Sequence, residues 1–370
     1  MAQGGRGEGA EDALGDGTGA GAEEDAFSGM HGGSREGPRG GNEPKVAAAC
    51  AGGAVVVLRD LMANPSCSRR RFLARSTAAL AVGARAFGAG AAPVRLGLVA
   101  DAQYVDAPAQ GTRHYRRSLA RLEAAVADFA SLPLAGCVHL GDLIDREWAS
   151  FAPMLAVLAG SRHRWHHLLG NHDFEVAEED KALVPPLLGV PARRGVFDLP
   201  GWRCLLLDTN DVSRYAHPAG SVARDEAERE LARLAAARVR QAKPWNGGVG
   251  PAQLRWFEAE CAAALREGRR VLVFSHHPVW PAGDHCVWNA GEVLAAVDRQ
   301  PNVAAWLNGH HHAGAFGERH GIPYVTLRGM VETADTTAYA VATLHADRLI
   351  LEGRGREPSR ELGLKPLATG

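Results

Sequence analysis

The sequence predicts an α/β fold that ends in a run of β-strands. From Val94 to about Gln300, short apolar segments alternate with segments in which apolar residues recur at helical spacing. From Ile322 to Gly355, three strand-like segments follow one another with no helix between them. The first pattern is typical of an α/β body, and the second indicates a meander of strands that completes it.

The composition is that of a soluble globular protein, because 46% of the 370 residues are hydrophobic and 22% are charged. A formal net charge of −1 gives no sign of a nucleic-acid-binding surface. The sequence contains no uncharged apolar stretch of about 18 residues or more, so no membrane helix is predicted. The six cysteines form no C-x-x-C pair, so we expect reduced thiols packed as small hydrophobic groups. Nothing in the sequence indicates the oligomeric state.

The N-terminal region contains two segments of different character. Residues 1–67 are a low-complexity leader, which we expect to be disordered because it cannot bury enough apolar surface. In Ser68–Pro93, arginines precede an Ala-rich apolar run, which resembles a twin-arginine export signal with Arg69 and Arg70 as the pair. Three interpretations stay open: an export signal that starts at Met62, a bipartite organelle-targeting leader, or a basic linker. The protein would be exported or organellar if the segment targets it, and cytoplasmic if the leader is inert.

The catalytic domain is expected over residues 93–358, after the targeting-like segment 68–92 and before a C-terminal tail, 359–370. Ten strands are predicted within residues 94–101, 136–142, 163–173, 195–211, 269–278, 303–312, 322–329, 338–346 and 347–355, the fourth range holding two strands joined by a Pro-Gly turn. Four helices are predicted within residues 114–132, 222–242, 250–268 and 290–300. The third helix has Pro251 in its first turn and Gly268 after its end, as helix termini favour.

Residues of metal-ligand type follow directly after five of the predicted strands. They are Asp101 and Gln103; Asp142 and Asp145; Asn171, His172 and Asp173; His276 and His277; and His310, His311 and His312. In α/β sheets ligands gather beyond the carboxyl ends of the strands. One such group alone is common turn chemistry, but five in series predict a single site of carboxylates, amides and imidazoles.

The series D-x-Q, G-D-x-x-D, G-N-H-D, an apolar strand with His, and G-H-x-H resembles the calcineurin-like metallophosphoesterases over roughly Val94 to Pro358. Segments such as LGLVADAQY, LLGNHDF, WNGGVGPAQLRWF and NGHHHAGAF resemble more closely the manganese-dependent ADP-ribose/CDP-alcohol diphosphatases. Gln103, where most members of the superfamily carry His, marks that subgroup. The resemblance implies a four-layer α-β-β-α sandwich of two mixed sheets, with the meander after Tyr324 completing the second sheet.

The resemblance also implies a dinuclear metal centre and assigns its ligands. Asp101, Gln103 and His312 would hold the first metal, Asn171, His276 and His310 the second, and Asp142 would bridge both. His172 would face the phosphate, with Asp145 fixing its ring. Two divalent ions about 3.5–4 Å apart can clamp a phosphoryl group. The amide oxygen of Gln103 favours Mn²⁺ at the first site, while Mg²⁺, Co²⁺, Zn²⁺ and Fe²⁺ stay open.

The implied function is hydrolysis of the phosphoanhydride in nucleoside diphosphate compounds such as ADP-ribose or CDP-choline. A metal-bound hydroxide would attack one phosphorus, and a nucleoside monophosphate and a phosphorylated product would leave. Two alternatives stay open: a phosphodiesterase or phosphomonoesterase of the same superfamily, and a catalytically silent scaffold. A scaffold is expected to lose metal ligands, yet every ligand position of the pattern is filled. A small nucleotide is thus the expected partner, with no nucleic acid and no membrane.

Substrate contacts are predicted less directly. The candidates are Tyr104 against a nucleobase, Arg113, Tyr115 and Arg116 near the second phosphate, and Cys286 with Trp288 in a loop over the base. Each has a structural alternative: packing at the pocket rim, a helix start with solvated arginines, or a buried thiol and a core indole. The backbone amides of Asn246–Gly248 could approach the substrate, although a simple turn explains them equally well.

Other histidines and one tryptophan are expected to play structural parts. We expect His277 to face away from the metals or to lie behind the ligands. His163, His166 and His167 are expected to be structural or exposed, and Trp306 to lie in the core. Within NGHHHAG, alternate side chains of an extended chain share a side, so His310 and His312 should reach the metals while His311 points elsewhere.

Overall fold

The computed structural model describes residues 92–367. The expectations for the leader and for the targeting-like segment up to Ala91 lie outside the described residues. Within the described part, no helix is long and apolar enough to cross a membrane.

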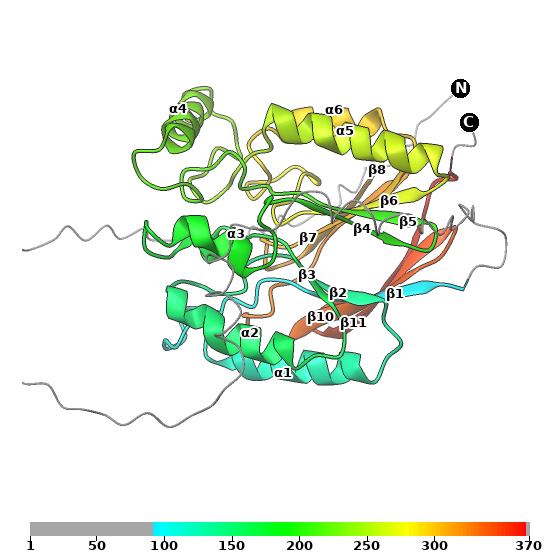
Figure 1. The fold of residues 1–370 in the computed structure, drawn as a ribbon, viewed down its shortest axis with the longest axis horizontal. Coiled ribbons are helices and arrows are strands. Elements are labelled where there is room, and N and C mark those ends of the chain that lie inside the picture. Colours follow the sequence, from blue (N-terminus) through cyan, green and yellow to red (C-terminus); the bar gives the residue numbers. More distant parts are fainter. Residues whose placement is uncertain (1–91, 368–370) are drawn as a thin grey trace, which may run out of the picture. The chain divides into compact units, whose positions relative to one another are not determined.

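Two six-stranded mixed sheets form the centre of the described chain (Figure 1). The first sheet has the order β12-β11-β10-β1-β2-β3, with β1 (Val94–Val99), β2 (Gly136–His139), β3 (Trp165–His167), β10 (Ala338–Leu344), β11 (Arg348–Gly355) and β12 (Arg360–Gly363). The second has the order β4-β5-β6-β7-β9-β8, with β4 (Gly195–Leu199), β5 (Trp202–Leu206), β6 (Arg270–Phe274), β7 (Val303–Asn308), β8 (Ala315–Arg319) and β9 (Ile322–Thr326).

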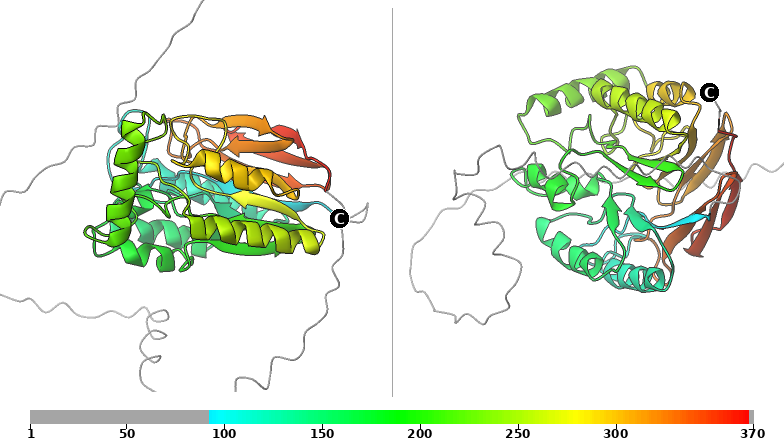
Figure 2. Two further views of the ribbon diagram at one scale, coloured as in Figure 1. Left: turned by 90° about the horizontal axis from the view of Figure 1, so that it is seen from above. Right: turned by 45° about the vertical axis from the view of Figure 1, so that its right-hand side comes forward.

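Helices cover the outer face of each sheet (Figures 1 and 2). The helices are α1 (Arg117–Ala130), α2 (Phe151–Ala159), α3 (Val184–Leu187), α4 (Val222–Ala236), α5 (Pro251–Arg266) and α6 (Ala290–Asp298). α1 and α2 lie against the first sheet, and α5 and α6 against the second. The four layers confirm the predicted α-β-β-α sandwich.

Three apolar clusters hold these layers together. Between the sheets, Leu98 of β1 and Leu140 after β2 pack in one cluster with Phe274 of β6. Phe129 of α1 belongs to the cluster beneath α1 and α2, and Phe257 of α5 belongs to the one beneath α5 and α6. Side chains alternate across each strand, so each sheet contributes to an inner and an outer cluster.

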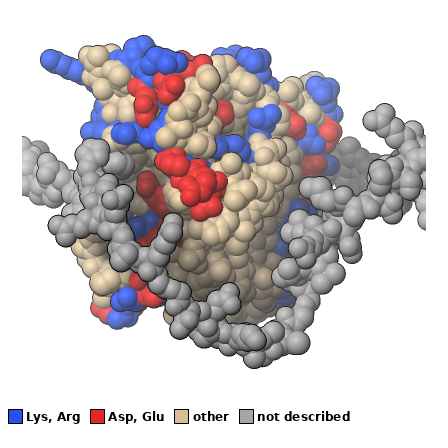
Figure 3. Space-filling view, turned by 60° about the vertical axis from the view of Figure 1, so that its left-hand side comes forward, with Lys and Arg blue, Asp and Glu red and all other residues tan. Residues whose placement is uncertain are grey.

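Helix boundaries follow the local signals in the sequence. α5 begins with Pro251 at its first position, and Gly268 beyond its end has φ +67°. The charged helix α4 is capped by the side chain of Ser221 and buries only Ala227 and Leu234, so it lies at the surface. On the face drawn in Figure 3, Lys and Arg are interspersed with Asp and Glu, in keeping with the near-neutral net charge.

The prediction that the meander after Tyr324 completes the second sheet is wrong. β9 does pair in the second sheet, but β10 runs antiparallel to β1, so β10, β11 and β12 extend the first sheet. β12 (Arg360–Gly363) lies in the segment expected to be a tail. The sequence analysis also did not propose β8 or α2. Strand partners are decided by contacts remote in sequence, which periodicity does not report.

The direction of the strands decides where the site forms. β1, β2 and β3 are mutually parallel neighbours, and so are β5, β6 and β7. Their carboxyl ends therefore reach one edge of each sheet. The predicted ligands follow these ends.

Candidate metal centre

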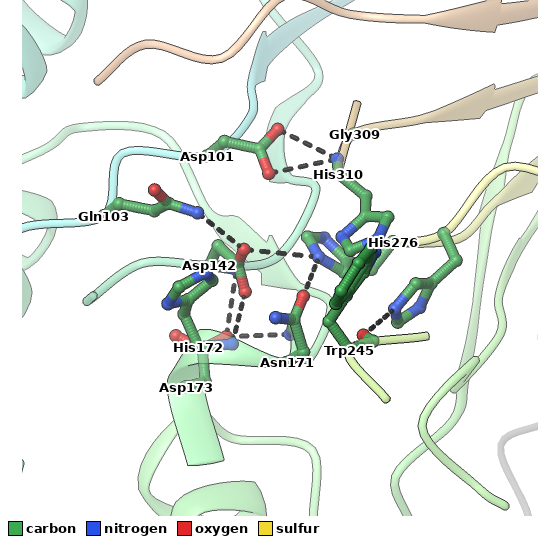
Figure 4. A network of polar contacts seen from close by, with 12 residues as sticks. Asp101, Gln103, Asp142, Asn171, His172, Asp173, Trp245, His276, Gly309 and His310 are labelled. Carbon is green, nitrogen blue, oxygen red and sulfur yellow. Dashed lines mark hydrogen bonds and ion pairs between the residues drawn. The ribbon is translucent and has the colours of Figure 1, made fainter. Parts of the chain in front are cut away.

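The polar residues that follow β1, β2, β3, β6 and β7 meet in one buried cluster (Figure 4). The seven residues proposed as metal ligands are linked into it by direct contacts: Asp101, Gln103, Asp142, Asn171, His276, His310 and His312. Asp101, Asp142 and His276 alone bring three ligand atoms within 4.8 Å of one another. The strand ends thus converge as expected.

The backbone at this cluster is strained. Four of the seven residues have left-handed backbone conformations: Asp101 (φ 52°), Gln103 (φ 44°), Asp142 (φ 59°) and His310 (φ 70°). For residues other than glycine such conformations cost roughly 1–3 kcal/mol each and persist where the surrounding structure imposes them. Strain of this kind gathers at functional sites, and here it turns four polar side chains toward one point.

Asp142 lies at the centre of the cluster, and Asp173 holds its loop. The carboxylate of Asp173 accepts hydrogen bonds from the backbone N–H groups of Gly170 (2.9 Å), Asp142 (3.1 Å) and Leu143 (2.8 Å). Burial, followed by the charge of Asp142, raises the pKa of Asp173 to about 7. Asp173 therefore fixes the turn from which Asp142 projects.

At the first predicted metal position, oxygen atoms and one imidazole face each other. Nε2 of Gln103 donates to Oδ2 of Asp142 at 3.0 Å, and Nε2 of His312 lies 3.6 Å from Oδ1 of Asp101. Oε1 of Gln103 is buried and has no hydrogen-bond partner among the described residues. A buried amide oxygen without a partner is costly, and coordination of a cation would satisfy it.

At the second predicted position, hydrogen bonds leave particular ring nitrogens available as ligands. Nδ1 of His276 donates to the carbonyl of Leu140 at 2.8 Å, and its Nε2 lies 3.1 Å from Oδ1 of Asn171. Nε2 of His310 is 2.9 Å from Oδ1 of Asn246. These partners select Nε2 of His276 and Nδ1 of His310 as the nitrogens that can accept a metal.

The charges around the cluster also suit cations. Burial by itself would raise the pKa of Asp142, but the charge of His276 holds it well below its usual value. Burial lowers the pKa of His276, but the charges and hydrogen bonds of its neighbours, Asp142 first among them, raise it to about 9. Against burial, hydrogen bonds to Asp101 and Glu332 raise the pKa of His312 to about 9. The carboxylates that favour a proton on His276 and His312 would attract a metal ion in the same way.

Glycines make room for this close packing. A Cβ atom on Gly170 would lie 2.0 Å from Oδ1 of Asp142, and one on Gly309 would lie 2.6 Å from Oδ2 of Asp101. Only glycine allows the carboxylates to sit so near the neighbouring turns. The unpaired amide oxygen, the oriented imidazoles and these glycines together fit a site for two divalent cations.

His172 lies beside the cluster rather than within the ligand set. Its backbone N–H donates to Oδ1 of Asp142 at 2.9 Å, and its Nδ1 is 3.0 Å from the carbonyl oxygen of Asp145. The Asp145 carboxylate lies 3.4 Å from Nδ1 and also pairs with Arg146 at 2.5 Å. The side chain of His172 is 22% exposed, so this imidazole can meet a substrate from outside.

A family model described as calcineurin-like phosphoesterase matches residues 95–314, more than half of the chain. The chain belongs to the calcineurin-like phosphoesterase family. It is therefore a metal-dependent phosphohydrolase, as the ligand series predicts.

Curated relatives similar to this chain are named manganese-dependent ADP-ribose/CDP-alcohol diphosphatase. The relative from Xenopus tropicalis is 29% identical, over 72% of this chain and 93% of its own length. The human relative is 28% identical, over 73% of this chain and 92% of its own length. A solved dimetal phosphatase from Danio rerio has a TM-score of 0.67 at 26% identity, covering 74% of this chain and 99% of that chain. The resemblance seen in the sequence is thereby confirmed.

The NGHHHAG segment follows β7 in this phosphoesterase, but it is not extended. His310 is left-handed, and the N–H of Gly314 donates to the carbonyl of His311 at 2.8 Å, so the segment turns. The prediction of an extended chain with alternating side chains is therefore wrong, although His310 and His312 do contact the cluster. His311 instead stacks on His285, with ring centroids 4.3 Å apart.

The remaining histidines of the phosphoesterase lie largely as expected. His277 is buried behind the ligands, with Nδ1 2.8 Å from Oγ1 of Thr209 and Nε2 3.2 Å from the carbonyl oxygen of Trp245. Its ring centroid lies 4.9 Å from that of His276 and 4.1 Å from that of His310. Of the two expected positions, His277 therefore takes the one behind the proposed ligands and does not face away from them. The fully buried Trp306 lies in the core.

One candidate phosphate contact, Arg113, lies beside a residue that contacts a proposed metal ligand. Its Nε is 3.9 Å from Oε1 of Glu332, which contacts His312. Tyr115 is buried, and burial and the charge of Asp145 raise its pKa. Arg116 instead forms an exposed ion pair with Asp106 at 2.5 Å, which is the solvated alternative.

Of the candidate contacts to the base, Tyr104 packs against the core and Cys286 lines a pocket. Tyr104 packs against the cluster beneath α1 and α2. Cys286 is buried, its thiol donates to the carbonyl of Pro281 at 3.2 Å, and burial raises its pKa. It lines a pocket of about 400 Å³ together with His285 and His311. Gly248 pairs with Val212 in a two-residue bridge, which favours the turn interpretation of that segment.

Three contacts were missed by the sequence analysis: the side chain of Asn246, the carboxylate of Glu332 and the backbone cradle around Asp173. Asn246 was considered only for its backbone, and Asp173 only as part of a motif. Glu332 follows no strand-end pattern at all. Each acts on a ligand through a contact remote in sequence, so no local signal marks it.

Proposed function

We propose that this protein hydrolyses the phosphoanhydride bond of nucleoside diphosphate compounds such as ADP-ribose and CDP-choline. The observation that carries the proposal is the convergence of seven residues with oxygen or nitrogen donor atoms, the buried Asp142 among them, in one cluster. The names of the relatives from Xenopus tropicalis and human support the choice of substrates. The products would be a nucleoside monophosphate and a second phosphorylated compound.

Two divalent cations, with Mn²⁺ as the preferred ion, would be held by the residues of this cluster. Asp101, Gln103 and His312 would hold one, Asn171, His276 and His310 the other, and Asp142 both. When bound, such a pair supplies Lewis-acid stabilisation of the phosphoryl group and makes water nucleophilic near neutral pH. The oxygen of Gln103 in place of an imidazole favours a harder ion than Zn²⁺, and the relatives' names support manganese.

The chain's own residues then position and protonate the substrate. His172 is the partly exposed imidazole at the edge of the cluster, where it can donate a hydrogen bond to a non-bridging or leaving oxygen. The carbonyl of Asp145 accepts from Nδ1–H of His172, which leaves Nε2 for the substrate. The nearby Asp145 carboxylate lies 3.4 Å from Nδ1 and would help to orient the ring, and a doubly protonated imidazole donates through Nε2–H as well.

Two features support contacts to the rest of the substrate. The guanidinium of Arg113, which lies beside Glu332, can donate two hydrogen bonds to a phosphate. The pocket that Cys286 lines is also lined by His285, whose ring centroid lies 5.5 Å from that of the proposed ligand His310. We propose that this pocket takes the part of the substrate beyond the attacked phosphate. For Tyr104, Tyr115 and Arg116 we propose a structural part near the site, through packing or an ion pair, and no direct substrate contact.

The test is incubation of the purified full chain with Mn²⁺ and a panel of phosphate compounds, with products separated by liquid chromatography. Nucleoside monophosphate should appear from ADP-ribose and CDP-choline. An Asp142→Asn variant is the matched control, because it removes the bridging charge and keeps the side-chain volume. Product from cyclic nucleotides or sugar phosphates alone would identify another phosphoesterase of the family. A chain that binds no Mn²⁺ and acts on none of these compounds would refute the proposal.

A further inference from the structure

Glu332 is a largely buried carboxylate for which the proposed function has no task. Its side chain is 13% exposed, and its Oε1 accepts a hydrogen bond from Nδ1 of His312 at 2.7 Å. The other ring nitrogen of His312, Nε2, lies 3.6 Å from Oδ1 of Asp101. The imidazole is thus held between two carboxylates, one on each nitrogen.

This arrangement determines which nitrogen of His312 can bind a metal. An imidazole nitrogen binds a cation through its lone pair, so the proton must reside on the other nitrogen. A carboxylate that accepts Nδ1–H selects that tautomer, orients the ring and makes Nε2 a stronger donor to the metal. Glu332 therefore directs Nε2 of His312 toward Asp101.

The loop that carries Glu332 is built to hold it in place. The backbone N–H groups of Met330 and Val331 donate to the carbonyls of Ala100 (2.9 Å) and Asp101 (3.0 Å). The chain before Glu332 is therefore in fixed register with the first ligand residue.

Two arginine side chains also donate hydrogen bonds to backbone carbonyls of this loop. Arg121 is 9% exposed and donates to the carbonyls of Met330 at 2.7 Å and Glu332 at 3.2 Å. Arg356 donates to the carbonyl of Gly329 at 2.5 Å. With its backbone fixed by these contacts, the carboxylate of Glu332 loses little further freedom when it holds His312.

Arg113 also lies beside the Glu332 carboxylate, with its Nε 3.9 Å from the same oxygen, Oε1. The carboxylate therefore lies near a guanidinium as well as contacting His312, so its position does not depend on His312 alone.

We propose that Glu332 is a positioning residue that orients His312 as an Nε2 ligand of the first metal ion. The inference rests on the proposed function, because it requires that His312 bind a metal. It concerns metal affinity rather than substrate choice, so binding without substrate can test it.

The test measures Mn²⁺ binding to the full chain by isothermal titration calorimetry, without substrate. In Glu332→Gln, which keeps the volume but removes the charged acceptor, one of two Mn²⁺ sites should weaken about 10- to 100-fold. The other site should keep its affinity. Glu352→Gln is the matched control, because Glu352 is 41% exposed and pairs with Arg95 on β1. Glu332→Asp keeps the charge and serves as a second variant should the Gln variant not fold.

A double-variant cycle separates positioning from a structural effect. In a His312→Ala background, Glu332→Gln should cause no further loss of Mn²⁺ affinity, because the residue it acts through is gone. Unchanged affinity in Glu332→Gln alone, or an equal further loss in the His312→Ala background, would overturn the inference. In both cases wild-type binding of two ions would leave the proposed function standing. A wild-type chain that binds no Mn²⁺ would refute both.

Discussion

Replacing Gly309 by Ala tests whether the exact position of the Asp101 carboxylate controls activity. Gly309 directly follows β7, and a Cβ atom there would lie 2.6 Å from Oδ2 of Asp101 and 3.2 Å from Cβ of Ala100. Ordinary contact begins near 3.4 Å, so the carboxylate must move by about 0.8 Å. It cannot move without cost, because the N–H of His310 donates to both of its oxygens, at 3.0 and 3.1 Å.

A displacement of about 1 Å in a catalytic group can lower a rate by roughly 100-fold. We therefore expect Gly309→Ala to reduce kcat/KM on ADP-ribose by about that factor and to weaken Mn²⁺ binding. Gly291→Ala in α6 is the control, since nothing lies within 4 Å of the added Cβ, and it should keep wild-type activity. Steady-state kinetics and Mn²⁺ titration measure both. Wild-type kinetics in Gly309→Ala would show that the site tolerates movement of Asp101, and the reasoning would fail.

Three further outcomes are expected. His312→Ala should lower Mn²⁺-dependent activity by on the order of 100-fold, whereas His311→Ala should retain most of it; equal losses, seen in the same kinetic assay, would contradict the ligand assignment. Gln103→Leu should reduce the manganese content, measured by elemental analysis, from two ions per chain toward one. Burial lowers the pKa of His166 and of His167 to about 4, below the unfolded value of about 6.5. The unfolded chain therefore takes up protons first, so thermal stability should fall as the pH drops from about 6.5 through 4. His166→Phe should lessen that fall in a melting series, and an unchanged slope would argue against this origin.

The sequence predicted the fold class and most elements because their signals are local. The helical spacing of Leu122 and Phe129 marks α1, and the Pro251 and Gly268 signals bound α5. Short elements such as β8 and α2 carry weak periodicity and were not proposed. The sheet to which β10, β11 and β12 belong was not predicted, because β10 joins it by pairing with β1, more than 200 residues away, and β11 and β12 follow β10.

The composition of the candidate site was predicted more completely than its support. Strand-end chemistry together with the family resemblance named the ligands, and the structure brings all seven together. The bystander position of His311 was expected for the wrong reason, since the chain turns at His310 with φ 70° instead of staying extended. Glu332 and Asn246 could not be found, because nothing near them in sequence shows that they touch His312 and His310.

By itself, the sequence determined which side chains this protein can offer a metal and in what order along the chain they come. It did so because polar residues after apolar strands, and glycines before them, are properties of neighbouring residues. Only the tertiary structure decided which nitrogen of each imidazole faces the cluster, which carboxylate holds His312, and that the amide oxygen of Gln103 has no hydrogen-bond partner among the described residues. Those choices depend on contacts between segments that follow different strands and lie far apart in the sequence, and such contacts exist only once the chain has folded.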